Sequence, residues 1–371
     1  MKTQKLFNYM FLCCLLFAAC KKSRNTPKED PQPAREISIA SGANHSLVLK
    51  PDQTLWATGN NNSGQLGDGT TTNKNNYFQV ATDVKAIFKS TWTTLALKND
   101  NTLWTWGNNT GGQLGDGTTT NNSTPKQVMT NVKTAAGGLY HSLFVKNDHS
   151  LWVVGANNYG QLGDATTVNK TIPIQVMTDV KDVAAGTYHS LILKNDNTLW
   201  TCGQNTWGQL GNGTTTDRST PTQVMTNVKA IAAAGQHSLV IKNDNTLWVF
   251  GLNNEGRIGI GTTDRTSTPM QIMTDVKAVA AGSTHSLILR NDNTLWACGE
   301  NNTGAVGDGT TINRATPVQV MTDVKAITAG LTFSTALKND NSLWSAGVNL
   351  NGQLGDGTNI NRPAFVRITL P

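Results

Sequence analysis

The sequence predicts an all-β fold, namely a seven-bladed β-propeller with about four antiparallel strands in each 48-residue repeat. Three observations predict it: one repeat fills residues 36–371, apolar and polar residues alternate within it, and the ends of the array match its middle. The composition agrees, because 35 glycines and a charged fraction of 15 % suit short strands and polar turns better than long helices.

Tryptophan marks the repeat most clearly. It recurs every 48 residues, at Trp56, Trp104, Trp152, Trp200, Trp248, Trp296 and Trp344. A glycine lies three residues after each tryptophan, and a G-Q-L-G segment or a degenerate copy follows it. Seven units of 48 residues account for all of residues 36–371, so the array contains no insertion. We expect each tryptophan to pack between neighbouring blades, where its large ring covers the most apolar area.

One unit, residues 179–226, shows the expected strands. They cover residues 180–186, 189–194, 198–203 and 223–225. The first ends in small residues, as an innermost strand must where the blades crowd the axis, and the second alternates apolar and polar residues as a half-buried strand does. A long polar loop, running to Pro221, separates the third strand from a short fourth one. Four strands per unit in seven units are typical of a propeller.

The two ends of the array favour a closed ring. A solenoid also repeats, but its terminal units usually differ from the others because they cap the stack. Here residues 36–42 copy the first strand of the repeat and residues 364–369 copy the fourth. The sequence leaves two ways of closing the ring. The edges of the blades could coincide with the edges of the repeats, or the N-terminal strand could complete the last blade.

The repeat resembles that of a known family. Its string A-A-G-x-x-H-S-L-x-L-K-N-D-N-T-L-W-x-x-G-x-N-x-x-G-Q-L-G-D-G-T is similar to the repeat of the regulator of chromosome condensation family, over all of residues 36–371. The resemblance implies a seven-bladed propeller. The family's eukaryotic founder is a nucleotide-exchange factor that binds chromatin, partners that an exported bacterial protein does not meet. A relative in fold, the propeller-type β-lactamase inhibitor protein, binds another protein with one face of its ring.

The first 20 residues have the layout of an export signal. Lys2 and Lys5 give a charged start, and the apolar run at residues 10–19 is shorter than the roughly 20 residues that span a bilayer. Two alanines directly precede Cys20, which resembles the lipobox of bacterial lipoproteins, with Phe17 in place of the usual leucine. We therefore expect Cys20 to be acylated after cleavage. An ordinary signal peptide, cleaved nearby, is the alternative.

The expected domains are a lipoprotein signal peptide at 1–20, a disordered tether at 21–35 and the propeller at 36–371. The tether is charged and rich in proline, without apolar periodicity. Several acyl chains would anchor the protein stably, because each buried methylene adds about 0.8 kcal/mol. Lys21 after the cysteine favours, by resemblance to other lipoproteins, the outer membrane. We expect a cell-envelope lipoprotein whose only membrane contact is this anchor, on either side of the outer membrane.

The charge distribution argues against nucleic acid as a partner. Residues 1–36 carry seven basic and three acidic residues, so they supply +4 of the formal charge of +6. The remaining chain is nearly neutral, whereas phosphate binding needs a concentrated cationic surface. Only Cys202 and Cys298 lie outside the leader, so no disulfide framework is indicated.

The repeated polar residues are interpreted as structural. Five repeats place a histidine at one position, as His45, His141, His189, His237 and His285. On different blades they should lie too far apart to converge on one metal ion, so we expect hydrogen-bonded structural histidines. The D-G-T segments that begin at Asp68, Asp116, Asp308 and Asp356 lack the acids of an EF-hand, which favours polar turns over calcium loops. No asymmetric acid–base cluster stands out, so we expect no enzyme and no cofactor.

Function is expected where the copies differ. The position before the repeated histidine carries Trp92, Tyr140 and Tyr188 in units two to four, and the position seven residues after the repeated tryptophan carries Tyr159 and Trp207. The latter position is acidic in unit five, at Glu255. If the strands run alternately up and down, both positions lie on one face. These six residues form the predicted binding site, since Tyr and Trp are enriched at interface hot spots.

The sequence therefore predicts a lipid-anchored, monomeric, non-catalytic propeller that recognises a protein through its aromatic face. Aromatic rings also stack on sugars, so a glycan-binding or polysaccharide-processing propeller is the first alternative. A passive spacer at the cell surface, in which the rings simply pack on neighbouring loops, is the second.

Overall fold

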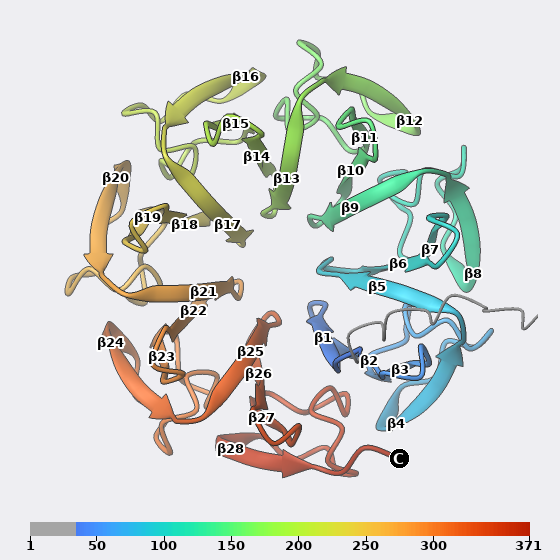
Figure 1. Ribbon diagram of the computed structural model, residues 1–371, viewed down its shortest axis with the longest axis vertical. Helices are drawn as coiled ribbons and strands as arrows, with labels where there is room; N and C mark the ends of the chain where they lie inside the picture. The colour runs from blue at the N-terminus through green and yellow to red at the C-terminus, as the bar shows by residue number, and fades with distance from the viewer. Residues whose placement is uncertain (1–34) are drawn as a thin grey trace, which may run out of the picture. The chain divides into compact units, whose positions relative to one another are not determined.

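Residues 35–371, the part of the chain that the computed structural model describes, form seven four-stranded antiparallel sheets around an axis (Figure 1). This confirms the predicted seven-bladed propeller. Each sheet contains four strands consecutive in sequence, so blades and repeats share their edges and the N-terminal strand stays in the first blade. Cys20, the leader and nearly all of the tether lie outside the described residues. Within residues 35–371, no helix is long and apolar enough to span a membrane.

The blades, numbered 1 to 7 in chain order, each contribute one innermost strand. These strands are β1 (Ser38–Ser41), β5 (Val84–Phe88), β9 (Val132–Gly137), β13 (Val180–Ala185), β17 (Val228–Ala234), β21 (Val276–Ala281) and β25 (Val324–Ala329). The second strands are β2 (His45–Leu49), β6 (Thr93–Lys98), β10 (His141–Lys146), β14 (His189–Lys194), β18 (His237–Lys242), β22 (His285–Arg290) and β26 (Phe333–Lys338). The second strands are the most buried, because sheet neighbours flank both of their edges and other blades cover both faces.

The third strands are β3 (Leu55–Gly59), β7 (Leu103–Gly107), β11 (Leu151–Gly155), β15 (Leu199–Gly203), β19 (Leu247–Gly251), β23 (Leu295–Gly299) and β27 (Leu343–Gly347). The outermost strands are β4 (Lys74–Ala81), β8 (Asn122–Met129), β12 (Lys170–Met177), β16 (Arg218–Met225), β20 (Thr266–Met273), β24 (Arg314–Met321) and β28 (Arg362–Ile368).

The outermost strand is longer than the sequence suggested. In blade 4 we expected residues 223–225, but β16 spans Arg218–Met225 and contains Pro221, which we had placed in the loop. The physical reason is the position of the strand at the sheet edge. Proline cannot donate a ladder hydrogen bond, but an edge strand has one side without a neighbour and tolerates it.

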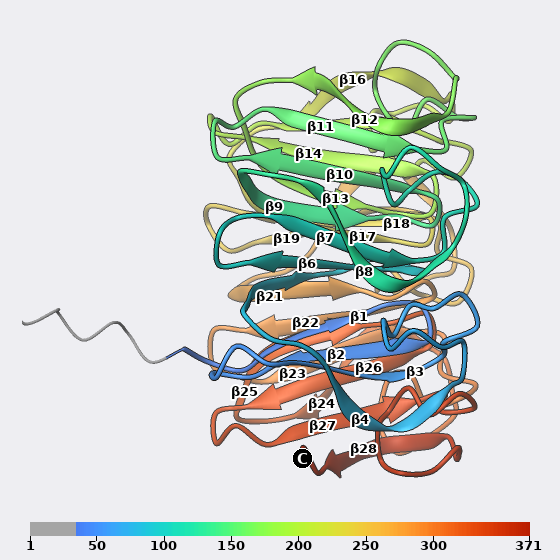
Figure 2. The same ribbon diagram turned by 90° about the vertical axis from the view of Figure 1, so that its right-hand side faces the viewer.

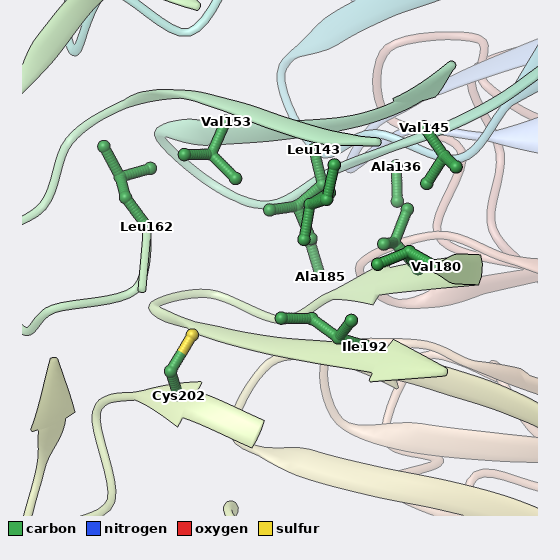
Figure 3. Packing of buried hydrophobic residues seen from close by; sticks show 11 residues of the cluster. Ala136, Leu143, Val145, Val153, Leu162, Val180, Ala185, Ile192 and Cys202 are labelled. Carbon is green, nitrogen blue, oxygen red and sulfur yellow. The ribbon is translucent and has the colours of Figure 1, made fainter. Parts of the chain in front are cut away.

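The hydrophobic core lies between the blades. One cluster joins Leu143 and Val153 of blade 3 to Val180 and Ile192 of blade 4, and Cys202 closes its outer end (Figure 3). The predicted packing of the repeated tryptophans is confirmed for six of them, which lie against clusters shared with the preceding blade: Trp56, Trp104, Trp152, Trp200, Trp248 and Trp296. Neighbouring blades are thus held together by apolar burial rather than by shared strands.

The ring closes between blade 7 and blade 1 without strand exchange. Ser46 Oγ donates to the carbonyl oxygen of Gln353 over 2.6 Å, and the amide of Leu331 donates to the carbonyl oxygen of Ala43 over 2.8 Å. The buried ring of Tyr77 fills the remaining space against Gly355. Closure therefore repeats the packing found between the other blades.

The strand order gives the ring two different faces, seen edge-on in Figure 2. We call hairpin face the side with the turn between the second and third strands of each blade and with the connections between blades. We call long-loop face the side with the loop between the first and second strands and the long loop between the third and fourth strands of each blade. The described chain starts on the hairpin face, where Arg35 donates to Asn99 Oδ1 in a turn of blade 2.

Candidate functional site

The long-loop face is supported from below by one buried asparagine in each blade. In blade 3, Asn157 Nδ2 donates to Asp164 Oδ1 over 2.9 Å and to the carbonyl oxygen of Thr166 over 3.0 Å. Asn157 Oδ1 accepts from the amide of Leu162 over 2.9 Å. A single fully buried side chain therefore fixes both ends of the long loop.

The D-G-T segments are polar turns whose carboxylates already have partners. Asp68 Oδ1 accepts from the amide and hydroxyl of Thr70 and from Asn61 Nδ2, and Asp68 Oδ2 lies 3.5 Å from Lys74 Nζ. These hydrogen bonds lower the pKa of Asp68 against the opposing effect of burial. The carboxylate therefore stabilises its own turn, in agreement with the polar-turn interpretation.

The repeated histidines connect neighbouring blades. His189 Nε2 lies 3.0 Å from Ser238 Oγ, and that hydroxyl lies 2.9 Å from the carbonyl oxygen of Gln209. Because the serine hydrogen points to the carbonyl, the imidazole Nε2–H must be the donor to Ser238 Oγ. The same pair occurs at His141, His237 and His285, each with the serine of the next blade. This is the hydrogen-bonded structural role that the sequence favoured.

Burial keeps these imidazoles neutral. It lowers the pKa of His45 and His141 to about 4 and that of His189 and His285 to about 3, and it also holds the pKa of His237 well below its usual value. A protonated imidazole would have to leave water without a counter-ion, which is costly in a low-dielectric interior.

Three of the six predicted site residues lie together on the long-loop face. The rings of Tyr159 in blade 3 and Tyr188 in blade 4 are tilted, with centroids 5.0 Å apart. The ring of Tyr140 also stacks on that of Tyr188, with centroids 6.2 Å apart. All three side chains are half-buried, so each buries one part of its ring on a neighbour and exposes another. We call these residues the tyrosine cluster.

The other predicted residues are not part of this cluster. Trp207 is half-buried on its own, with the guanidinium of Arg265 from the next blade 5.5 Å from its ring centroid. Trp92 is half-buried in blade 2, where its carbonyl oxygen accepts from the amide of Asn108. Glu255 forms an ion pair with Arg257 in its own loop.

The sequence model of the RCC1-like domain matches residues 16–240 and 166–370, which together cover most of the chain. The chain belongs to the RCC1-like domain family. An RCC1-like propeller of this kind is typically a protein-binding scaffold, which agrees with the predicted function class.

Solved structures support the same fold. This RCC1-like propeller is similar to human WBSCR16, with a TM-score of 0.77, 23 % identity, and coverage of 86 % of this chain and 94 % of that one. It is also similar to Prp20p from Saccharomyces cerevisiae, whose binding to Gsp1p and histones has been studied, with a TM-score of 0.73, 23 % identity, and coverage of 82 % and 84 %. No curated protein sequence matches the chain.

The sequence analysis missed one feature of this RCC1-like propeller, at its axis. Lys89 follows β5 directly and lines the axial cavity. At the same repeat position, four other blades carry alanine: Ala185, Ala233, Ala281 and Ala329. The sequence signal is a lysine at a repeat position of the innermost strand that carries a small residue in every other blade.

Proposed function

We propose that this RCC1-like propeller is a lipid-anchored, non-catalytic binding module that recognises a protein partner through the long-loop face. The observation that carries the proposal is the tyrosine cluster, which gathers Tyr140, Tyr159 and Tyr188 from three loops of two blades. Half-exposed tyrosines combine a large apolar area with a hydroxyl, the combination found at interface hot spots. Trp207 and Arg265 extend the same face as a second contact point.

The anchor at Cys20 is part of this proposal. Arg35 and Glu36 contact the hairpin face, through Asn99 and Lys325 respectively. An anchor upstream of them would join the propeller on that face and leave the long-loop face free for a partner. Metabolic labelling of the wild-type protein and of Cys20→Ser with a fatty-acid analogue tests the anchor, since only the wild type should become labelled.

Site-specific photo-crosslinking in the native cell envelope tests the binding face. A photoreactive amino acid at Asn158, the exposed neighbour of Tyr159, should give a discrete covalent product with one protein. The matched control places it at Asn302, the equivalent exposed position in blade 6. Products from both positions, or from neither, would contradict recognition through the tyrosine cluster.

A triple variant then tests the side chains themselves. Tyr140→Ala, Tyr159→Ala and Tyr188→Ala together should abolish the crosslinked product, because truncation of a hot-spot aromatic costs about 2 kcal/mol or more of binding free energy. The matched variant changes Thr303 and Thr332 to alanine, at the same two repeat positions on blades 6 and 7, and should keep the product.

A glycan is the second candidate ligand, since tyrosine faces such as those of Tyr159 and Tyr188 can stack on sugar rings. It makes a different prediction: the purified protein should bind defined oligosaccharides on an array, and the triple variant should not. A spacer would neither crosslink nor bind sugars, and the triple variant would behave as the wild type in every assay.

A further inference from the structure

The innermost strands enclose an axial cavity of about 250 Å³. Its wall is mainly alanine, isoleucine and valine, supplied by all seven blades. Lys89 is the one charged side chain among the described residues that line it. The side chains of the wall are thus apolar apart from the amine of Lys89 and the hydroxyl of Thr328, and only blade 2 supplies an amine.

Lys89 lies at the long-loop end of this cavity. It comes directly after β5, whose last residues run toward that face, and its Nζ donates to the carbonyl oxygen of Ala281 at the end of β21. Blade 2 and blade 6 are not neighbours, so the side chain reaches across the axis. The Lys89 side chain is half-buried and lines the cavity.

The surrounding backbone is shaped to hold Lys89 in place. Its carbonyl oxygen accepts from the amide of Gly137 in blade 3 over 2.9 Å. The next residue, Ser90, forms a buried hydrogen bond with Thr93 and occupies space that only a glycine at position 137 leaves free, since a Cβ there would lie 2.1 Å from Ser90 Oγ. Blade 3 thus accommodates Lys89 and Ser90 of blade 2 through the glycine at position 137.

The electrostatic surroundings of Lys89 lack a counter-ion. Within residues 35–371 it forms no salt bridge, and its charge acts on the buried His237 and His285, on which the guanidinium of Arg257 also acts. Glu255, the nearby acid of blade 5, is already paired with Arg257. Burial accordingly lowers the pKa of Lys89 to about 7. An ammonium group in such a site is stabilised by any anion that can reach it.

We propose that the axial cavity binds a small monocarboxylate with an unbranched apolar tail, whose carboxylate pairs with Lys89 and whose tail lies along the alanine, isoleucine and valine wall. The volume suits this class of ligand, because an apolar cavity of about 150 Å³ already holds a benzene ring. Sites for drug-sized ligands span about 300–1,000 Å³. A cavity of about 250 Å³ therefore suits a ligand smaller than these. The site is separate from the tyrosine cluster and does not depend on the function proposed for it.

Isothermal titration of the full-length protein with hexanoate tests this proposal. Hexanoate should bind, and 1-hexanol, which has the same tail without the charge, should bind about 10- to 100-fold more weakly, the range expected for loss of a hydrogen bond to a charged group. Affinity should also fall about fourfold for each methylene removed, toward acetate. Failure of hexanoate to bind, or equal binding of hexanol, overturns the proposal.

Lys89→Ala is the decisive variant, because it introduces the residue that four other blades carry at this position. Its thermal unfolding should match the wild type, while its affinity for hexanoate should drop about 10- to 100-fold. Lys85→Ala, an exposed lysine on the same strand, is the matched control and should bind as the wild type does. Unchanged affinity in Lys89→Ala would show that the ligand sits elsewhere.

A second readout reports on the ion pair directly. In the wild type, NMR titration of the Lys89 side chain should show its pKa rising from about 7 when hexanoate is bound, because a bound carboxylate stabilises the ammonium form. A pKa that does not move on saturation with hexanoate excludes the pairing even if the acid binds.

Discussion

The two faces of the ring are made of the same repeat, yet different kinds of bond hold their loops. On the hairpin face, each turn is fixed by its own residues: Asp196 Oδ1 accepts from the amide and the hydroxyl of Thr198, and Asn197 closes the turn with a φ of 63°. On the long-loop face, buried residues such as Asn157 and His189 hold the loops from below and from the adjacent blade.

This difference explains where the sequence can vary. In a hairpin turn, the aspartate and the threonine that follows it hold the turn through their own side chains, so a substitution of either removes a bond of the turn. A long loop is fixed by its buried base, and its tip has no structural task. The tyrosine cluster, Trp207 and Glu255 all occupy such tips. The long-loop face therefore combines a rigid base with replaceable contact residues, the arrangement that a binding surface needs.

The largest effect is expected from acid, which should destabilise the buried residues that support the long-loop face. The unfolded chain binds a proton at each histidine below about pH 6.5, whereas the folded state keeps His45 and His141 neutral down to about 4 and His189 and His285 down to about 3. The free energy of unfolding therefore falls as the pH drops through this window. Each histidine that is protonated only in the unfolded chain contributes up to about 1.4 kcal/mol per pH unit, so the five buried histidines together give a steep loss of stability.

Urea unfolding between pH 7 and pH 4 measures this slope. His189→Phe should remove one histidine's share, about 1.4 kcal/mol per pH unit, and the fold should accept it because Phe333 occupies the same position in blade 7. Stability that stays constant from pH 6.5 to pH 4.5 in the wild type would mean that the buried imidazoles become protonated without unfolding.

The second-largest effect is expected at a single loop base. Asn157→Ala removes the bonds to Asp164, Thr166 and Leu162 and leaves buried backbone groups without partners. We expect a loss of about 3 kcal/mol in the free energy of unfolding, measured by urea titration. Asn158→Ala, its exposed neighbour, is the control and should stay within about 0.5 kcal/mol of the wild type. Equal losses would erase the distinction between base and tip.

Sequence alone predicted the fold because the repeat contains most of its determinants. The tryptophan spacing predicts the number of blades, and the alternating strand directions predict that Tyr140 and Tyr159 lie on one face. The outermost strands were the exception. Their edges accept residues such as Pro221 that a propensity argument assigns to loops, so sheet position overrides composition there.

The site was only partly predictable, because contacts between a long loop and the neighbouring blade join residues 29 apart rather than residues one 48-residue repeat apart. Tyr159 meets Tyr188 across the blade boundary, 29 residues further along the chain. The same separation joins Ser142 Oγ to the carbonyl oxygen of Gln113, so it describes how each long loop meets the next blade. Applied to Trp207, this spacing leads to Gln236 rather than to an aromatic residue, which is why Trp207 lies apart from the cluster.

The tyrosine cluster offers a finer test, because its tips contact one another. A double-mutant cycle on Tyr159→Ala and Tyr188→Ala should give a coupling energy of about 0.5–1.5 kcal/mol in urea unfolding, the range for tilted aromatic pairs. The same cycle on Trp92→Ala and Trp207→Ala should give a coupling near zero, since these rings lie on different blades without a shared contact. Coupling of similar size in both cycles would indicate that the tips are linked through the scaffold.

The smallest single effect is expected for glycine in a hairpin turn, where the contrast between two substitutions carries the information. Asn197 has a positive φ, as does the equivalent residue of every other blade, and only glycine adopts this conformation more easily. Asn197→Gly should leave the free energy of unfolding within about 0.5 kcal/mol of the wild type, because relief of strain offsets the entropy gained by the unfolded chain. Asn197→Val should cost about 1–3 kcal/mol, because a β-branched side chain opposes a positive φ. If valine were tolerated as well as glycine, the turn would not be fixed by its own residues, and the two faces would differ less than their bonds indicate.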